Sequence, residues 1–255
     1  MTRKLSIQAY TVRDFLTTKE QMLDTFKKLA SFGYTGLHTA GDYDLGYDVY
    51  KQCADEAGLE IVGTHVPFQM FSDIDETVRI HKLLDTNLAG VGGMPNDEGR
   101  HDVKALSKYI DDVNKIAEQL AKHGMKFTYH NHSFEFGKIG NDMIFEVMER
   151  EFDPKNVSFV LDTCWVAHGG QSNYEWMEKL AGRIDILHIK DRGMSTLNLD
   201  MNVKELGKGN LNFPRIIKHA EDLGIKHLCY EQDFNFEVDA LKSAKDSAEY
   251  FFSIK

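Results

Sequence analysis

The chain has 255 residues, of which 42% are hydrophobic and 27% charged, so it can bury one sizeable core. No stretch has the composition of a linker, and we expect a single domain over residues 1–255. The formal net charge of −10 argues against a nucleic-acid partner and against attraction to anionic lipid, because both require clustered basic side chains.

Short apolar runs alternate with stretches of helical spacing along the whole chain. Several helical stretches end at a glycine, as Lys19–Phe32 does before Gly33 and Val103–His123 does before Gly124. The predicted strands are 4–10, Tyr34–Thr39, Leu59–Thr64, Leu88–Gly93, 126–136, Val157–Leu161, Ile184–Leu187 and His227–Tyr230. The predicted helices are Lys19–Phe32, Tyr47–Ala57, 72–86, Val103–His123, Met143–Phe152, Tyr174–Gly182, Phe213–Leu223 and Val238–Phe252.

These elements form eight strand–helix units, or one per roughly 32 residues, which is typical of a (β/α)₈ TIM barrel of the ~250-residue class. Ser72, three residues before Asp75, predicts the start of the third helix. The competing open doubly wound sheet would carry a glycine-rich turn after its first strand, but that turn reads TVRDFLT. We therefore expect an α/β protein with a single (β/α)₈ barrel.

The cysteines and residues 1–20 indicate the cellular compartment of the protein. Cys53, Cys164 and Cys229 are odd in number and widely spaced, which disfavours a disulfide framework and favours a reducing cytoplasm. Charged side chains interrupt residues 1–20, so no apolar core of a signal peptide is present there, and no run approaches the ~18 apolar residues of a membrane span. The sequence predicts a cytoplasmic protein that does not enter the membrane.

Polar residues follow most of the predicted strands, at the end where barrel enzymes carry their catalytic groups. A single residue of this kind is usually a satisfied side chain at the rim. Carboxylates and imidazoles gathered in one mouth, however, would repel one another or stay unsatisfied without a cation. The pattern therefore predicts a metal site built from strand ends, with its candidates among His38, His65, His130, His132, Asp162, His188 and Glu231.

Six segments occur in the order and spacing of a known family: SIQAYTVRD, YHNHSFEF, VLDTCWVAHGG, RIDILHIKD, LGKGNLNF and YEQD. With them, nearly the whole sequence resembles the xylose isomerase-like barrels, which include sugar isomerases and epimerases, inosose dehydratases and apurinic endonucleases. The resemblance implies a divalent metal held by a Glu, an Asp, a His and a second Glu from strands five to eight. Asp162, His188 and Glu231 match the last three of these ligands.

The first ligand position differs from that of many relatives, which read Glu-Asn-His where this chain reads His130-Asn131-His132. Inosose dehydratases are similar here, with His-Pro-His. Imidazole is an acceptable ligand for several divalent metals, and we expect Mn²⁺ first, with Zn²⁺, Co²⁺ or Fe²⁺ as alternatives. In FTYHNH the side chains of Thr128, His130 and His132 point to one face of the strand. We therefore prefer His130 as the fourth ligand and Glu135 as a catalytic base or as a residue that supports the ligands, and the reverse assignment remains open.

The other candidate site residues each have a plain structural alternative. Lys190 and His132 are the further catalytic candidates. Lys190 points either to a substrate oxygen or to a surface salt bridge, and we favour the first because it follows a ligand at a barrel mouth. Trp165 could stack on a sugar or be an ordinary rim aromatic. It stands where endonuclease relatives have another zinc-binding histidine. His65 and Asp233 are assigned to substrate binding, the latter within the EQD that inosose dehydratases share in similar form.

The function that the resemblance implies is a metal-dependent isomerase or epimerase acting on a small keto-sugar or polyol, whose enediolate the metal would stabilise. His130 breaks the pair of carboxylates with which epimerase relatives exchange a proton, so an inosose dehydratase-like lyase is the alternative. A non-catalytic sugar-binding barrel is an alternative of another class. A repair nuclease is disfavoured by the charge and by Trp165. The expected partner is a small carbohydrate, and a homo-oligomer is possible.

Overall fold

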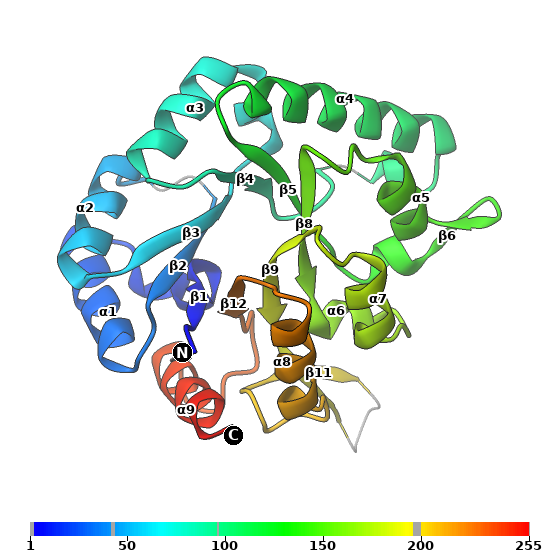
Figure 1. Cartoon of the computed structure of the whole chain (residues 1–255). Coiled ribbons are helices and arrows are strands. Elements are labelled where there is room, and N and C mark those ends of the chain that lie inside the picture. Colours follow the sequence, from blue (N-terminus) through cyan, green and yellow to red (C-terminus); the bar gives the residue numbers. More distant parts are fainter. Residues whose placement is uncertain (1–2, 42–43, 96, 196–199, 255) are drawn as a thin grey trace.

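A computed structural model of the chain describes residues 3–41, 44–95, 97–195 and 200–254. Eight parallel strands close into a barrel in the order β1-β12-β9-β8-β5-β4-β3-β2, and helices surround it (Figure 1). The predicted (β/α)₈ fold is therefore confirmed. The barrel strands are β1 (Ser6–Gln8), β2 (Gly36–Ala40), β3 (Glu60–His65), β4 (Leu88–Val91), β5 (Lys126–His130), β8 (Val157–Asp162), β9 (Ile184–Ile189) and β12 (His227–Tyr230).

Helices follow the strands along the chain and cover the outside of the barrel (Figure 1). None of the helices in the described ranges is long and apolar enough to span a membrane. The α-helices are α1 (Lys19–Ser31), α2 (Tyr47–Ala57), α3 (Ile74–Leu83), α4 (Val103–Ala121), α5 (Ile144–Glu151), α6 (Thr163–His168), α7 (Asn173–Lys179), α8 (Phe213–Asp222) and α9 (Ala240–Ser253). Short 3₁₀ helices are η1 (Ala9–Phe15), η2 (Phe68–Ser72), η3 (Glu98–Arg100) and η4 (Phe134–Phe136).

Two hairpins and the helix α6 were not predicted. The hairpins are β6 (Lys138–Ile139) with β7 (Asp142–Met143), and β10 (Asp191–Met194) with β11 (Met201–Lys204). Their strands are too short, or too polar, to show the alternation on which strand prediction relies.

The start of α3 differs from the prediction by one residue. Asp73 is the N-cap, and its carboxylate accepts a hydrogen bond of 3.0 Å from the backbone N–H of Glu76. The hydroxyl of Ser72 instead donates to the carbonyl of Gln69 in η2. Because serine and aspartate are both good caps, the spacing alone did not decide between neighbours.

The end of β5 differs from the prediction, and this difference affects the site. The predicted strand 126–136 stops at His130, and Phe134–Phe136 forms η4. Asn131 ends the strand: its side-chain carbonyl accepts from the backbone N–H of Asp162 at 3.0 Å, which ties β5 to β8. The argument that His130 and His132 share one face of a continuous strand is therefore wrong, because His132 lies beyond the strand.

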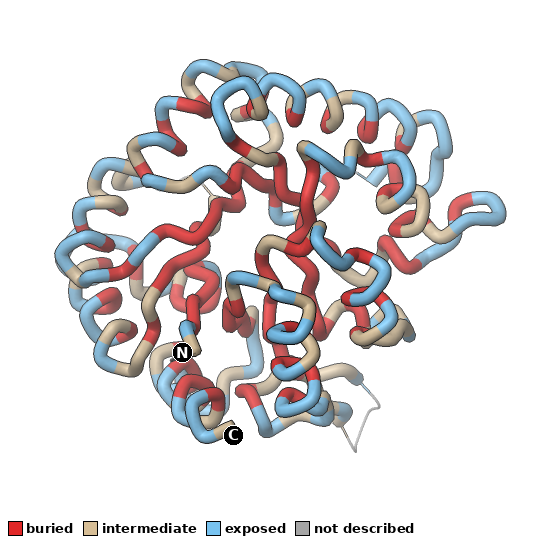
Figure 2. Tube along the Cα trace, viewed as in Figure 1, coloured by how far each residue is buried: buried red, intermediate tan, exposed pale blue. Residues whose placement is uncertain are grey.

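The core has two parts. A large apolar cluster fills the space between the strands and the helices, and a small one lies apart from it and consists of Val62, Leu88, Val160, Ile186 and Cys229. Figure 2 shows the barrel strands as buried, with the exposed residues on the outer surface. Close strand approach needs glycine at Gly90, where a Cβ atom would lie 2.0 Å from Thr128 Oγ1.

The LGKGNLNF segment has a structural explanation. It folds over the carboxylate of Asp191, which accepts hydrogen bonds of 3.0 Å from the backbone N–H groups of Gly207 and Gly209 and one of 3.2 Å from that of Leu211. A Cβ atom on Gly209 would lie 2.2 Å from Asp191 Oδ1, so glycine is required there. This loop fixes the chain directly after Lys190.

Candidate metal centre

The four side chains that the sequence predicted as metal ligands lie together at the C-terminal ends of the barrel strands. They are those of His130, Asp162, His188 and Glu231. They are all buried, and one ligand atom of each lies within 4.8 Å of the ligand atoms of the others. His188 Nδ1 is 2.9 Å from Glu231 Oε2. His130 Nε2 is 3.5 Å from Asp162 Oδ2.

The register of the barrel brings these groups together. Asp162 is paired with His188 across β8 and β9, and His188 is paired with Cys229 across β9 and β12. Asp162 Oδ1 also caps α6, because it accepts a hydrogen bond of 2.9 Å from the backbone N–H of Trp165. The cap fixes the carboxylate, and Oδ2 is the oxygen that contacts the cluster.

Three carboxylates surround a single buried ammonium. Lys190 Nζ lies 3.0 Å from Glu231 Oε2 and 3.4 Å from Asp162 Oδ2. It also lies 2.8 Å from Asp233 Oδ2. With neutral imidazoles, this group keeps an excess of negative charge away from solvent, which is costly unless a cation balances it.

The atoms of the cluster fit a divalent cation. Among the residues that the structure describes, His130 Nε2 and Asp162 Oδ2 have no hydrogen-bond partner although both are buried. Buried polar atoms of this kind normally have a hydrogen-bond partner, so these two atoms lack a partner that a bound cation would supply. Two imidazoles with two carboxylates form a ligand set that suits Mn²⁺, Fe²⁺ or Zn²⁺. The buried cluster could therefore bind a metal.

The protonation of the cluster also reflects its negative field. Burial by itself raises the pKa of Glu231, but Lys190 and His188 hold it well below the ordinary value of a glutamate. Burial lowers the pKa of His130, whereas Asp162 and Glu231 raise it, and the result lies above the ordinary value. Glu231 therefore stays ionised, and His130 holds a proton more readily than an ordinary histidine does, beside the carboxylates that would bind a cation.

A second layer of polar side chains supports His188. Its Nε2 atom lies 2.9 Å from His38 Nδ1, and Gln8 Nε2 lies 3.2 Å from His65 Nδ1. Burial, and then the neighbouring imidazoles, lower the pKa values of His38 and His65 well below the ordinary value. A neutral His38 ring can accept the Nε2–H of His188, which leaves His188 Nδ1 free for a cation. The imidazoles of His38, His65 and His188 form a second group that could hold a metal ion.

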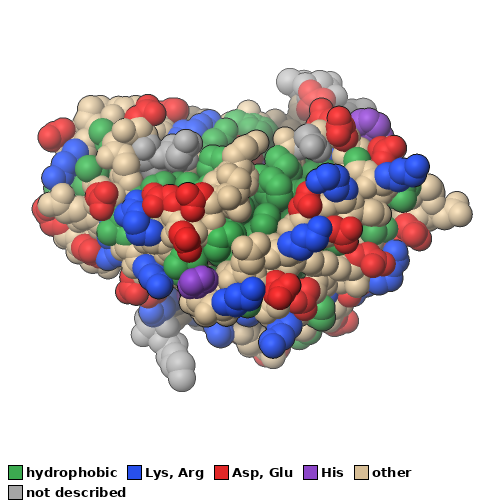
Figure 3. All heavy atoms as spheres, turned by 90° about the horizontal axis from the view of Figure 1, so that it is seen from above, with side chains coloured by type: hydrophobic (Ala, Val, Ile, Leu, Met, Phe, Trp, Pro, Cys, Tyr) green, Lys and Arg blue, Asp and Glu red, His purple; other side chains and the backbone are tan. Residues whose placement is uncertain are grey.

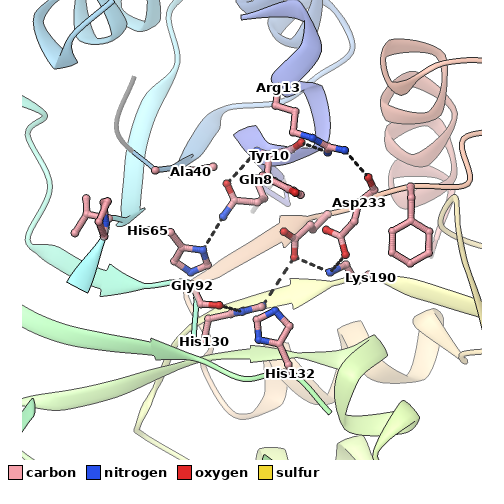
Figure 4. A pocket seen from close by; sticks show the side chains of 15 residues that line it. Gln8, Tyr10, Arg13, Ala40, His65, Gly92, His130, His132, Lys190 and Asp233 are labelled. Atoms are coloured by element: carbon pink, nitrogen blue, oxygen red, sulfur yellow. Dashed lines mark hydrogen bonds and ion pairs between the residues drawn. The ribbon is translucent and has the colours of Figure 1, made fainter. Parts of the chain in front are cut away.

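A cavity of about 650 Å³ opens above the cluster, and Figure 4 shows how side chains from different strand ends point into it. A cavity of this size fits a small-molecule substrate. Of the residues that the sequence predicted, it is lined by His65, His130, His132, Lys190, Glu231 and Asp233. Lining residues that the sequence analysis missed include Gln8, Tyr10, Arg13 and Phe234.

Arg13 connects two of the loops around this cavity. Its guanidinium donates to the backbone carbonyl of Tyr10 at 2.7 Å and to that of Asp233 at 3.1 Å (Figure 4). Arg13 and Gln8 both belong to the SIQAYTVRD segment, at and directly after the end of β1. The rule that strand ends carry the site could have found them if it had been applied to amides and guanidinium groups as well as to metal ligands.

Asp233 and His132 differ in how they hold a proton. Burial, and then the charge of Glu231, raise the pKa of Asp233 to about 6. Burial, and then His130, lower the pKa of His132 to about 3. Near neutral pH, Asp233 can therefore exchange a proton, whereas the His132 ring stays neutral.

Of the predicted site residues, Asp162, His188, Trp165 and Glu135 do not line this cavity. Trp165 lines an adjoining cavity, with Lys190 Nζ 5.0 Å from its ring centroid. Glu135 is fully buried, and its carboxylate accepts hydrogen bonds from Tyr129 Oη at 2.7 Å and from the backbone N–H of His132 at 2.9 Å. Burial raises the pKa of Glu135 to about 7. These contacts make Glu135 a support for the loop that carries His132.

The face of the molecule drawn in Figure 3 is mixed in charge. Figure 3 shows acidic and basic side chains interspersed over one face. A protein that binds the phosphate backbone of nucleic acids would instead gather basic side chains into a stripe.

Residues 26–254 match the model of a family described as xylose isomerase-like TIM barrel. An inosose dehydratase from Geobacillus thermodenitrificans (strain NG80-2) is 33% identical over 191 residues, which are 67% of this chain and 63% of that protein. An inosose dehydratase from Mesomycoplasma hyopneumoniae (strain 7448) is 29% identical over 108 residues, or 42% of this chain and 33% of that protein. The chain thus spans less than two thirds of the length of either relative.

Among solved structures, a sugar phosphate isomerase/epimerase from Parabacteroides distasonis ATCC 8503 superimposes with a TM-score of 0.80. The two proteins share 26% sequence identity, and the match covers 100% of this chain and 96% of that one.

Proposed function

Because the chain belongs to the xylose isomerase-like TIM-barrel family, we propose that it is a divalent-metal-dependent enzyme that acts on a keto-sugar or keto-polyol. In this proposal it removes a proton from the carbon next to the carbonyl. The observation that carries the proposal is the buried cluster of two imidazoles and two carboxylates, with unpartnered ligand atoms, beside an accessible cavity.

His130, Asp162, His188 and Glu231 would hold the cation, which supplies Lewis-acid polarisation of a substrate carbonyl and hydroxyl oxygen. Asp233, with its pKa raised to about 6, accepts the proton. Burial lowers the pKa of Lys190, but the surrounding carboxylates raise it well above the ordinary value, so the ammonium stays charged. We assign to Lys190, which lines the cavity, the role of proton donor to a substrate oxygen.

We put the loss of a β-hydroxyl group, a lyase reaction, ahead of isomerisation. The α-proton passes to Asp233, a carbon–carbon double bond forms, and the hydroxyl leaves with a proton from Lys190 as water. Asp233 then returns its proton to Lys190 across 2.8 Å. Inversion at one carbon would instead need proton-exchanging groups on both faces of the substrate, and the imidazoles of His65 and His132 remain neutral. The similarity to inosose dehydratases also favours elimination.

Isomerisation or epimerisation is the second candidate. The observation in its favour is the match over the full chain to a sugar phosphate isomerase/epimerase. It shares with elimination the removal of the α-proton, so the same residues would serve both reactions. The two candidates differ in whether the product has lost water.

The test uses the Mn²⁺-loaded protein in D₂O with a panel of keto-inositols and ketohexoses, followed by mass spectrometry. The proposal predicts a product that has lost one water and that forms only with metal. Asp233→Asn should lower turnover by about 10²–10⁴-fold, the usual contribution of a general base, at unchanged metal content. An isomer labelled with deuterium would support the second candidate. Binding without deuterium incorporation or loss of water would indicate a non-catalytic sugar-binding barrel.

A further inference from the structure

A second cavity, of about 540 Å³, adjoins the one above the metal centre. The two cavities share Val66, Pro67, Gly92 and His132 as lining residues, so they lie side by side. Each is by itself in the range of about 300–1,000 Å³ that holds a whole small ligand. Together they offer more room than a single sugar ring occupies.

Aromatic rings form much of the wall of this second cavity, contributed by Phe68, Phe134 and Trp165. These residues come from η2 after β3, from η4 after β5 and from α6 after β8. The rings of His132 and Phe134 are stacked, with centroids 5.9 Å apart and an interplanar angle of 14°. The Arg100 guanidinium lies 3.9 Å from the Phe134 ring centroid on the same wall.

The wall also carries polar side chains, those of Gln69, Arg100, His132 and Ser133. Amide, guanidinium, imidazole and hydroxyl groups can donate hydrogen bonds to oxygen atoms of a ligand. A ligand with apolar faces and oxygen acceptors at its edge would meet both features of the wall.

We propose that this second cavity binds a second sugar ring, joined through a glycosidic bond to the ring that reacts at the metal centre. A pyranose or furanose ring stacks its C–H face on aromatic side chains and presents hydroxyl oxygens to N–H donors. His132 lines both cavities and therefore lies where the linkage between the rings would pass. The substrate class is a keto-disaccharide or a related glycoside. This inference rests on the proposed function for the position of the reacting ring.

The test compares the binding of D-fructose with that of glucosyl-fructoses of different linkage, namely turanose, maltulose and isomaltulose, to the Mn²⁺-loaded protein by calorimetry. At least one disaccharide should bind tenfold more tightly than D-fructose. It should also change the emission of Trp165, whereas Trp176 is buried against Phe136 and Phe145 and should not respond.

Phe134→Ala should reduce the preference for the disaccharide to within twofold and leave the affinity for D-fructose unchanged. Phe68→Leu, at another lining residue, gives a second, milder variant in case Phe134→Ala does not fold. Phe252→Ala, which removes a half-exposed ring on α9, is the matched control and should change neither affinity.

Two results would overturn the inference while leaving the proposed function in place. One is metal-dependent binding of D-fructose with no gain for any disaccharide. The other is an equal loss of both affinities in Phe134→Ala. If no sugar of this series bound the Mn²⁺-loaded protein, the inference would fail, and the proposed function would be decided by its own panel of keto-inositols and ketohexoses.

Discussion

Glu231 and Glu135 are both buried carboxylates, and they lie on different sides of the barrel wall. Glu231 faces the cavity beside Lys190 and His188, which keep its pKa well below the ordinary value despite burial. Glu135 contacts Tyr129 and a backbone N–H group, and burial raises its pKa to about 7. The difference teaches that burial alone makes a carboxylate keep its proton, and that nearby positive charge decides which one stays ionised.

The largest expected effect comes from removing the ammonium that faces three carboxylates. Lys190→Met should destabilise the metal-free protein by roughly 3–5 kcal/mol, because it leaves buried carboxylates without their partner. Urea unfolding in the presence of a chelator measures this. Lys179→Met is the control: its ion pairs with Glu146 and Glu149 are exposed, and it should cost less than about 1 kcal/mol. Equal losses in the two variants would contradict the contrast between Glu231 and Glu135.

The second prediction concerns pH and Glu135. The folded protein holds this proton up to pH about 7, whereas the unfolded chain releases it near the ordinary value of 4.5. The stabilisation is therefore complete below pH 4.5 and is lost as the pH rises through 7, by about 3 kcal/mol. Glu135→Gln should abolish this part of the pH dependence of unfolding between pH 4.5 and 8. Glu118→Gln, at an exposed position of α4, should leave it intact.

The contrast also explains what the sequence could and could not predict. The convergence of Asp162, His188 and Glu231 was predictable, because parallel strands deliver their ends to one face and each ligand follows an apolar run. The place of Glu135 was not, because it depends on the turn at Asn131. That turn is held by a hydrogen bond to Asp162, which lies on a different strand. Local periodicity carries no information on such a contact.

Other parts of the site were missed for related reasons. Gln8 ends β1 and Arg13 follows it, but an amide and a guanidinium do not stand out as metal ligands do. The second cavity is lined by residues of several segments, among them Phe68 after β3 and Phe134 after β5, which lie far apart in the sequence. The hairpin of β10 and β11 was missed because its strands are short and polar.

The smallest expected effect concerns the second layer. His38 Nδ1 lies 2.9 Å from His188 Nε2, and loss of such an outer partner typically weakens metal binding by about 10–100-fold. His38→Ala should show this loss in a Mn²⁺ titration. His81→Ala is the matched control, because His81 is an equally buried imidazole that bonds Thr64 and the Thr77 carbonyl, away from the cluster. Equal Mn²⁺ affinities in the two variants would show that His38 does not support the metal centre.

The central claim is that the buried cluster, and not Glu135, holds a divalent cation. The most direct measurement is an equilibrium titration of Mn²⁺ into the wild-type protein, Asp162→Asn and Glu135→Gln. Asparagine can still cap α6 through its side-chain oxygen, so the Asp162 variant changes mainly the charge. We expect a single tight site in the wild type and in Glu135→Gln, and at least about 100-fold weaker binding in Asp162→Asn. Wild-type affinity in Asp162→Asn, or loss of the site in Glu135→Gln, would contradict the claim.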